Sequence, residues 1–137
     1  MAYRVLVVDD DPVIVRLLEV NLRLEGHDVE TASRGEEALE RAAATSPDLL
    51  IMDVMMPGLD GWETLQRLRA QPAFATTPVI LLSARAQDED RSRRLELRSV
   101  SYVAKPFDPA RLMELVGTLL RGGSSVIDDL SSGEAGA

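Results

Sequence analysis

Four short apolar runs, each followed by a polar side chain, constrain the fold of this chain more than any other feature. The runs cover residues 5–8, 49–52, 79–82 and 102–104, and the side chains that follow them are Asp9 with Asp10, Asp53, Ser83 and Lys105. Runs that are apolar throughout are typical of strands buried on both faces of a parallel sheet. The carboxyl ends of such strands share one edge, and ligands bind in the crevice beyond it. We therefore expect three carboxylates, one hydroxyl and one ammonium group to meet at one site.

Helical patterns alternate with these runs. Asp11 and Pro12 predict a helix start, because an acid suits the cap position and proline suits the first helical position, and Gly26 predicts the end of that helix. Ser33, with Glu36 three residues later, predicts a capping box for the next helix. The expected strands cover about residues 3–8, 28–32, 48–52, 79–82 and 101–104. A helix follows each strand, which implies a three-layer α/β sandwich with right-handed crossovers between parallel strands.

In the last third of the folded part, the two expected helices have signals of different strength. Residues 87–97 are charged and expected to be helical, with Leu95 and Leu97 as their clear apolar contacts. Asp108 and Pro109 predict a well-defined start for the final helix. We therefore expect five strand–helix units in a single domain, since a chain of 137 residues has the usual size of one domain.

The sequence divides into two parts of different composition. Residues 1–121 carry the strand and helix patterns, and residues 122–137 are rich in glycine and serine. The second part is interpreted as a flexible tail or linker. Residues 126–130 are interpreted as plain disorder, with a weak docking motif as the alternative. The chain is expected to be either a stand-alone domain or a piece cut from a longer protein at its linker.

The charge balance excludes some classes of partner. The formal net charge is −8, from 23 acidic against 15 basic residues. Such a balance disfavours nucleic-acid binding and docking on an anionic membrane, and no basic recognition helix is visible. The apolar runs are too short to cross a membrane. The sequence has no cysteine, so it offers no disulfide or thiolate metal site, and we expect a cytoplasmic location.

The acidic residues at the strand ends suit a divalent cation. Asp11 fits the helix cap because Pro12 follows it, which leaves Asp9 and Asp10 without a structural role. Mg²⁺ takes one or two carboxylates together with waters and phosphate oxygens. Asp10 and Asp53 could therefore bind Mg²⁺ with Asp9 behind a water molecule, although an isolated aspartate at either place would more often cap a helix or a turn. A carboxylate beside a metal can attack phosphorus and form an aspartyl phosphate.

Ser83 and Lys105 supply what a phosphoryl group requires. A hydroxyl can donate to one phosphoryl oxygen and an ammonium group can neutralise another, and phosphoryl transfer depends mostly on positioning and charge stabilisation of this kind. Taken alone, either residue would be ordinary polar surface. Pro106 holds Lys105 in an extended conformation, and whether the peptide bond between them is cis is left open.

With these residues in this order, the sequence resembles the receiver domain of response regulators in two-component signalling. The resemblance covers roughly residues 3–121. It depends on the segments Val-Leu-Val-Val-Asp-Asp-Asp-Pro at 5–12, Asp53 with Met-Pro-Gly-Leu-Asp-Gly at 56–61, Leu-Leu-Ser-Ala at 81–84 and Tyr-Val-Ala-Lys-Pro-Phe at 102–107. The resemblance implies a flavodoxin-like fold with strand order 2-1-3-4-5. It also implies that Asp53 accepts a phosphoryl group from a sensor histidine kinase, a phosphotransfer protein or a small donor such as acetyl phosphate.

The resemblance also implies roles for other residues. Mg²⁺ would be bound by Asp10, Asp53 and the backbone carbonyl of Met55, with Asp9 assisting through water. Such a domain is a signalling phosphoacceptor that takes part in its own phosphorylation and dephosphorylation, rather than an enzyme acting on a separate substrate.

A switch is implied as well. Ser83 would contact the phosphoryl group and Lys105 would pair with it. Tyr102 would then turn inward as Ser83 moves, and the face formed by the fourth helix, fifth strand and fifth helix would change. The alternative for Tyr102 is an edge aromatic residue with its hydroxyl at the surface.

Two other functions fit these residues less well. An aspartate-nucleophile phosphatase places a second aspartate two residues after the nucleophile as general acid, but this position is Met55. A pseudo-receiver would bind proteins without phosphorylation, and the complete set of site residues argues against it. Arg98 to Ser101 replace the Gly-Ala-Asp-Asp-like stretch common in receivers, so dimerisation through this face is left open. The effector and pathway are not readable from these residues.

Overall fold

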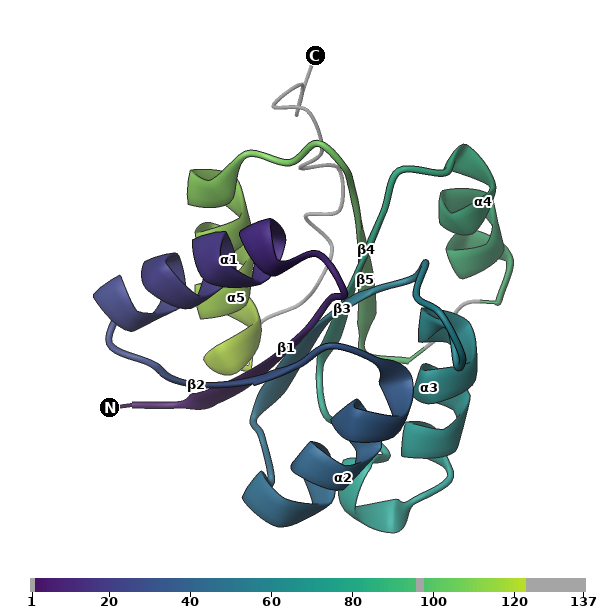
Figure 1. The fold of residues 1–137 in the computed structure, drawn as a ribbon, viewed down its shortest axis with the longest axis horizontal. Helices are drawn as coiled ribbons and strands as arrows, with labels where there is room; N and C mark the ends of the chain where they lie inside the picture. Colours follow the sequence, from purple (N-terminus) through teal and green to yellow (C-terminus); the bar gives the residue numbers. More distant parts are fainter. Residues whose placement is uncertain (1, 96–97, 123–137) are drawn as a thin grey trace.

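The computed structural model describes residues 2–95 and 98–122 of the chain. Strands and helices alternate along it (Figure 1). The strands are β1 (Arg4–Val8), β2 (Asp28–Ala32), β3 (Leu49–Asp53), β4 (Val79–Ser83) and β5 (Val100–Ala104). The helices are α1 (Pro12–Leu24), α2 (Gly35–Thr45), α3 (Gly61–Arg69), α4 (Ala86–Leu95) and α5 (Pro109–Leu120), with a short 3₁₀ helix at Pro72–Phe74. No helix in these described ranges is long and apolar enough to cross a bilayer.

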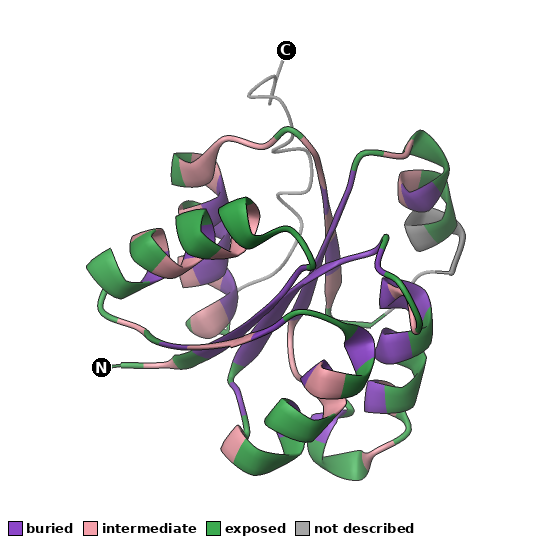
Figure 2. Ribbon diagram, viewed as in Figure 1, coloured by how far each residue is buried: buried purple, intermediate pink, exposed green. Residues whose placement is uncertain are grey.

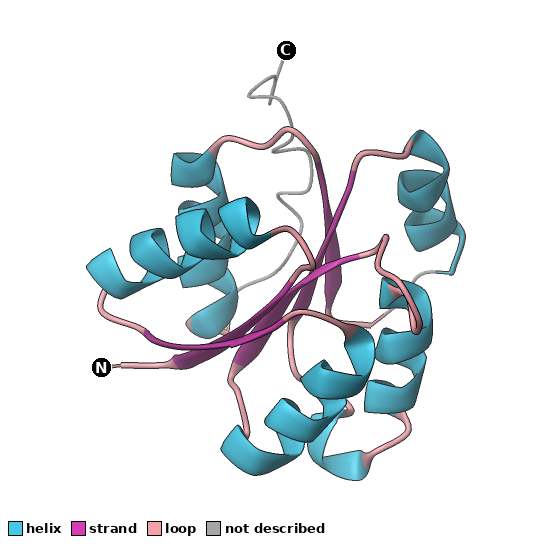
Figure 3. Cartoon of the chain, viewed as in Figure 1, coloured by secondary structure: helices cyan, strands magenta, loops and turns pink. Residues whose placement is uncertain are grey.

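The five strands form one parallel sheet in the order β2-β1-β3-β4-β5. This order confirms the predicted flavodoxin-like topology. Because the strands are parallel, their carboxyl ends meet at the same edge, and the loops that leave this edge lead into the helices (Figure 3). The sheet therefore brings together polar residues that lie far apart in the sequence.

Two hydrophobic cores lie on opposite faces of the sheet. Alternate residues of a strand enter different cores: Val5 and Val7 pack against α1 and α5, whereas Leu6 and Val8 pack against α2 and α3. Figure 1 shows α1 with α5 on one side of the sheet and α2 with α3 and α4 on the other. The central strands are therefore buried along their whole length (Figure 2), which explains why their sequences are apolar without alternation.

The predicted starts of the first and last helices are confirmed. The Asp11 carboxylate accepts from the backbone N–H of Val13 at 2.9 Å, and the Asp108 carboxylate accepts from that of Ala110 at 3.0 Å. In both helices proline occupies the first turn, where its missing N–H costs no helical hydrogen bond. Gly26, just after α1, has φ of +91°, a conformation that glycine adopts without strain.

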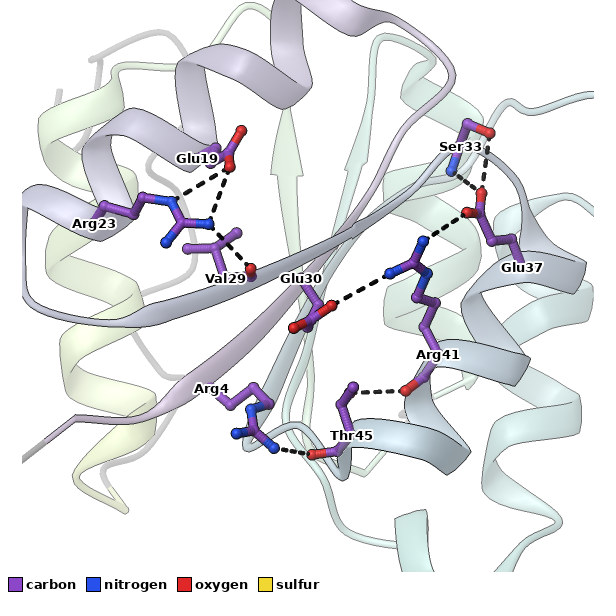
Figure 4. A network of polar contacts seen from close by, with 9 residues as sticks. All are labelled: Arg4, Glu19, Arg23, Val29, Glu30, Ser33, Glu37, Arg41 and Thr45. Atoms are coloured by element: carbon purple, nitrogen blue, oxygen red, sulfur yellow. Dashed lines mark hydrogen bonds and ion pairs between the residues drawn. The ribbon is translucent and has the colours of Figure 1, made fainter.

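The capping box predicted for Ser33 and Glu36 is wrong. Helix α2 begins at Gly35, two residues after Ser33, so Glu37 rather than Glu36 lies within reach. The N–H and the hydroxyl of Ser33 both donate to Glu37 Oε1, at 2.8 and 3.1 Å. The other oxygen of Glu37 accepts from Arg41, which extends the network along the helix (Figure 4).

The turn that leads into β5 has Arg98 and Ser99 where receivers commonly have glycine, and it is held by a side chain. Ser99 has φ of +58°, in the left-handed region. The guanidinium of Arg69, at the end of α3, donates to the carbonyls of Arg98 and Ser99 at 3.2 and 3.3 Å, and to that of Phe74 at 2.7 Å. The side chains of Leu95 and Leu97, expected as the apolar contacts of α4, lie outside the described residues, as does most of the expected tail, including residues 126–130.

Candidate functional site

The acidic residues meet where β1 and β3 end. Val8 is paired with Met52 in the parallel register, so Asp9 and Asp53 come next on neighbouring strands. Both are buried, whereas Asp10 is exposed at the start of the loop. One carboxylate oxygen from each of these three residues lies within 4.8 Å of the other two. This set of hard oxygen donors could hold a divalent cation.

Lys105 follows the carboxyl end of β5 and completes the cluster. Its backbone N–H donates to the carbonyl of Ser83 at 2.9 Å, which keeps it beside β4. Its side chain reaches across the sheet edge, and Nζ lies 3.2 Å from Asp9 Oδ2 and 3.2 Å from Asp53 Oδ1. The peptide bond between Lys105 and Pro106 is cis.

The cluster has more acidic than basic groups, and these groups shift one another's pKa values. Burial and, after it, the charge of Asp9 raise the pKa of Asp53 to about 6, against the opposing effects of Lys105 and the N–H of Met55. Burial also raises the pKa of Asp9, despite its hydrogen bond from the N–H of Asp11. Burial alone would lower the pKa of Lys105, but the charges of Asp53 and Asp9 outweigh it and raise that pKa. Two buried carboxylates thus share one ammonium group, which favours the binding of a further cation.

A glycine brings helix α3 close to the end of β3. A Cβ on Gly61 would lie 2.7 Å from both the carbonyl oxygen of Asp53 and the Cα of Val54. The N–H of Gly61 donates to the carbonyl of Val54 at 2.8 Å. A larger residue here would push the loop that follows Asp53 out of place. Next to this loop, a cavity of about 510 Å³ opens between Met55, which is half exposed, and Arg85.

Ser83 lies at the end of β4 and is fully buried. Its hydroxyl donates to Asp88 Oδ2 at 2.5 Å and accepts from the N–H of Arg85 at 3.0 Å. Asp88 also accepts from the indole N–H of Trp62 at 3.0 Å and forms two 2.8 Å contacts with the Arg85 guanidinium. In this structure Ser83 is therefore held by α4 and its preceding loop.

Tyr102 lies next to Ser83 and is partly buried. Its hydroxyl lies 3.2 Å from the carbonyl of Ser83 and 3.0 Å from that of Arg85, and it donates toward this loop. Burial raises the pKa of Tyr102, and the charge of Glu89 adds to the rise. The phenol is thus engaged with the segment that also carries the serine.

Sequence reasoning missed Asp88 and Trp62 as members of the site. Asp88 falls among residues 87–97, which were expected only to be charged and helical, and no role was predicted for Trp62. The structure buries Asp88 to 2% exposure. The contact between them spans 26 residues, and no local pattern indicates it.

A five-stranded parallel sheet of order 2-1-3-4-5, with an acidic cluster and a lysine at its carboxyl edge, defines the class of flavodoxin-like α/β proteins. Within this class the assignment is specific. The chain belongs to the response regulator receiver domain family, whose model matches residues 5–117.

Individual relatives agree with this assignment. The chain is 44% identical over 121 residues to the alkaline phosphatase synthesis transcriptional regulatory protein PhoP of Bacillus subtilis, a match that covers 88% of the chain and 50% of PhoP. The chain thus spans about half the length of that regulator.

Solved structures give the same result. The receiver domain of Francisella response regulator 1452 is 36% identical, with a TM-score of 0.79, over 88% of this chain and 98% of that one. The receiver domain of sensor histidine kinase PA1611 from Pseudomonas aeruginosa is 31% identical, with a TM-score of 0.77, over 88% of this chain and 99% of that one. That structure has a magnesium ion coordinated in its active site cleft.

Proposed function

We propose that this receiver domain, assigned to residues 1–121, accepts a phosphoryl group on Asp53 from a sensor histidine kinase, a phosphotransfer protein or a small donor. The observation that carries the proposal is the position of Asp53. Its carboxylate is buried at the sheet edge, 3.2 Å from the Lys105 ammonium group and within a cluster of three acids. A signalling phosphoacceptor in a two-component or phosphorelay system needs this combination of nucleophile and positive charge.

The residues present fit Mg²⁺. The three carboxylates supply only oxygen donors, and two buried anions share one ammonium group. We assign Asp10, Asp53 and the backbone carbonyl of Met55 as direct ligands, with Asp9 acting through water. When bound, Mg²⁺ would neutralise charge on the phosphoryl oxygens. The ion in the cleft of the Pseudomonas receiver domain supports this assignment.

Asp53 and Lys105 have distinct roles in the transfer. A carboxylate oxygen of Asp53 attacks phosphorus, and a new P–O bond forms as the bond from phosphorus to the donor breaks. The donor leaves with that electron pair, as an imidazole nitrogen of phosphohistidine or as an acetate oxygen of acetyl phosphate. Lys105, already beside Asp53, would pair with a phosphoryl oxygen and limit the build-up of negative charge.

The output would follow from the new charge. A phosphoryl group adds about −1.5 to −2 charge and new acceptor oxygens. Ser83 and Tyr102 would respond to it and alter the face formed by α4, β5 and α5, which an effector protein would recognise. Both residues contact the loop between β4 and α4, so movement of one would affect the other. Donors of this kind are made inside the cell, and we place the reaction in the cytoplasm.

A protein donor would approach Asp53 across α1. This helix begins two residues after Asp10, and it exposes apolar side chains at helical spacing. These are Val13, Leu17, Val20 and Leu24. Because α1 lines a pocket together with Asp9 and Asp10, we assign this stripe to the donor. Changing Leu17 to serine should slow labelling by a phosphorylated kinase core and leave labelling by acetyl phosphate unchanged.

A pseudo-receiver that binds partners without phosphorylation is less well supported. Such a protein would not need a buried carboxylate, a lysine and two more acids in contact. A phosphatase is disfavoured too, because Met55 stands where its general acid would be.

Intact-protein mass after incubation with acetyl phosphate and Mg²⁺ tests the proposal. The wild type should gain one phosphoryl group, and Asp53→Asn or addition of EDTA should abolish the gain. Asp28→Asn, which makes the same chemical change at the exposed start of β2, should be labelled like the wild type. If neither acetyl phosphate nor phosphohistidine donors label the wild type, the pseudo-receiver replaces this proposal.

A further inference from the structure

The carboxylate of Asp88 is a buried group that neither the acidic cluster nor its lysine uses. It lies in the first turn of α4, is 2% exposed and receives four donors. Oδ1 accepts from Trp62 Nε1 at 3.0 Å and from Arg85 Nη2 at 2.8 Å. Oδ2 accepts from Ser83 Oγ at 2.5 Å and from Arg85 Nε at 2.8 Å. Asp88 therefore joins α3, the end of β4 and the following loop.

The bond from Ser83 has a direct consequence for phosphoryl binding. A serine hydroxyl has one proton, and here it is donated to Asp88 in a short, charge-assisted hydrogen bond. A phosphoryl group on Asp53 carries only acceptor oxygens, so Ser83 can bind it only with that same proton. Asp88 and the phosphoryl group therefore compete for one donor.

Asp88 would still accept hydrogen bonds if Ser83 were released. The carboxylate would keep the indole N–H of Trp62 and both contacts to Arg85, so its buried charge would stay compensated. The Trp62 ring is itself covered by the Arg91 guanidinium, 4.6 Å from the ring centroid. A change at Ser83 would thus alter the surroundings of a tryptophan on α3.

We propose that Asp88 is a positioning residue that holds the Ser83 hydroxyl in the unphosphorylated protein and opposes its transfer to the phosphoryl group. This inference rests on the proposed function. Asp88 thereby lowers the affinity of the site for a phosphoryl group and links phosphorylation to Trp62.

The test measures affinity for beryllofluoride, a phosphoryl mimic, in the presence of Mg²⁺ by titration calorimetry. In Asp88→Asn the amide oxygen can accept from Trp62 and from Arg85 Nη2, and the amide nitrogen can donate to Ser83 Oγ, which frees the serine proton at the cost of the contact to Arg85 Nε. We expect this variant to bind beryllofluoride about tenfold more tightly than the wild type, since that factor corresponds to about 1.4 kcal/mol, of the order of one hydrogen bond. Asp90→Asn, the same change at an exposed position of α4, should bind like the wild type.

A second background separates positioning from a structural effect. In Ser83→Ala there is no hydroxyl to compete for, so adding Asp88→Asn should leave the affinity of that variant unchanged. An equal gain with and without the hydroxyl would overturn the inference, as would an unchanged or weaker affinity of Asp88→Asn alone. If the wild type itself binds no beryllofluoride, the proposed function falls and this inference with it.

A measurement that needs no change at Asp88 provides an independent check. Trp62 is the only tryptophan of the chain, so its indole N–H gives a single assigned NMR signal. Beryllofluoride should shift this signal in the wild type, because Asp88 loses one of its donors, and should shift it at least twofold less in Ser83→Ala. A signal that does not move in the wild type, or that moves equally in both proteins, contradicts the inference.

Discussion

At the scale of single residues, the site contains more buried negative charge than positive charge. Asp9 and Asp53 are both buried, and Lys105 is the cation that contacts both. The raised pKa of Asp53, about 6 against an ordinary value of 3.8, means that folding makes this carboxylate harder to ionise. The folded protein therefore pays for the arrangement with stability at neutral pH, where Asp53 is charged in both the folded and unfolded states.

This charge predicts a pH-dependent effect of Asp53→Asn. Below about pH 4, Asp53 is protonated whether or not the chain is folded, and the substitution should change stability little. As the pH rises from about 4 to about 6, the unfolded chain releases its proton first, so the wild type loses stability that the neutral asparagine keeps. We expect Asp53→Asn to be more stable than the wild type by roughly 2 kcal/mol at pH 7.5 in EDTA.

Urea unfolding of both proteins across this pH range measures the difference. Asp28→Asn, away from the cluster, should differ from the wild type by less than about 0.5 kcal/mol at every pH. A stability difference for Asp53→Asn that stays constant between pH 4 and pH 7.5 would show that ionisation of Asp53 is not its cause.

At the scale of elements, the helix ends are set by short-range contacts. Helix α3 begins with a capping box in which Asp60 accepts from the N–H of Glu63 at 2.9 Å, and Glu63 accepts from the N–H of Asp60 at 3.1 Å. Helix α2 ends differently, because its last cap, Ser46, has φ of +49° and ψ of +66°. A left-handed conformation is costly for serine and free of strain for glycine.

Asp60→Ala should destabilise the protein. It removes the side-chain bond from the N–H of Glu63 and leaves the bond from the backbone N–H of residue 60 to Glu63, and the loss of one such cap costs about 1 kcal/mol. Thermal unfolding in EDTA should record a correspondingly lower free energy of unfolding. Asp11→Ala, which removes the single side-chain cap bond of α1, is the comparison and should cost a similar amount, and an unchanged stability of Asp60→Ala would contradict the cap.

Ser46→Gly should have the opposite effect. Relief of the left-handed backbone outweighs the extra freedom that glycine gives the unfolded chain, and we expect a gain of about 0.5 kcal/mol. Ala70→Gly is the matched control, because Ala70 caps α3 with φ of −72° and gains nothing from glycine. Chemical denaturation of the two variants should show changes of opposite sign, and a loss of stability in both would refute the argument.

At the scale of the whole molecule, the sheet collects charges from distant parts of the chain into one place. Lys105 contacts Asp9 over a separation of 96 residues, and Asp53 over 52. Both contacts form only because β1, β3, β4 and β5 lie side by side in this order in the sheet. A ligand that binds this cluster should therefore stabilise the entire fold, since the cluster exists only when the sheet is complete.

Mg²⁺ should raise the thermal stability of the wild type. At a concentration about a hundredfold above the dissociation constant, ligand binding adds roughly 2.7 kcal/mol. Differential scanning calorimetry with Mg²⁺ and with EDTA should show this gain in the wild type and in Asp28→Asn. Asp10→Asn should lose most of it at the same Mg²⁺ concentration, and an undiminished gain in Asp10→Asn would exclude Asp10 as a ligand.

The sequence by itself determined features that depend on neighbours along the chain. The length and composition of the apolar runs identified four of the five strands, and Asp11 and Asp108 marked helix starts, because a cap bond joins residues only two or three positions apart. The strand ends also predicted that Asp9, Asp10, Asp53 and Lys105 would meet, and their side chains lie together at the sheet edge, whereas the hydroxyl of Ser83 bonds to Asp88 instead. These expectations follow from backbone geometry, and the strand order came from the family resemblance.

Only the tertiary structure decided which side chains pair once the layers are packed. Ser33 bonds to Glu37 because α2 starts later than its cap signal suggests. Asp88 is buried because α3 and α4 lie on the same face of the sheet, where Trp62 and Ser83 can both reach it. A polar side chain is buried only where donors converge on it, and that convergence depends on how elements distant in sequence pack together.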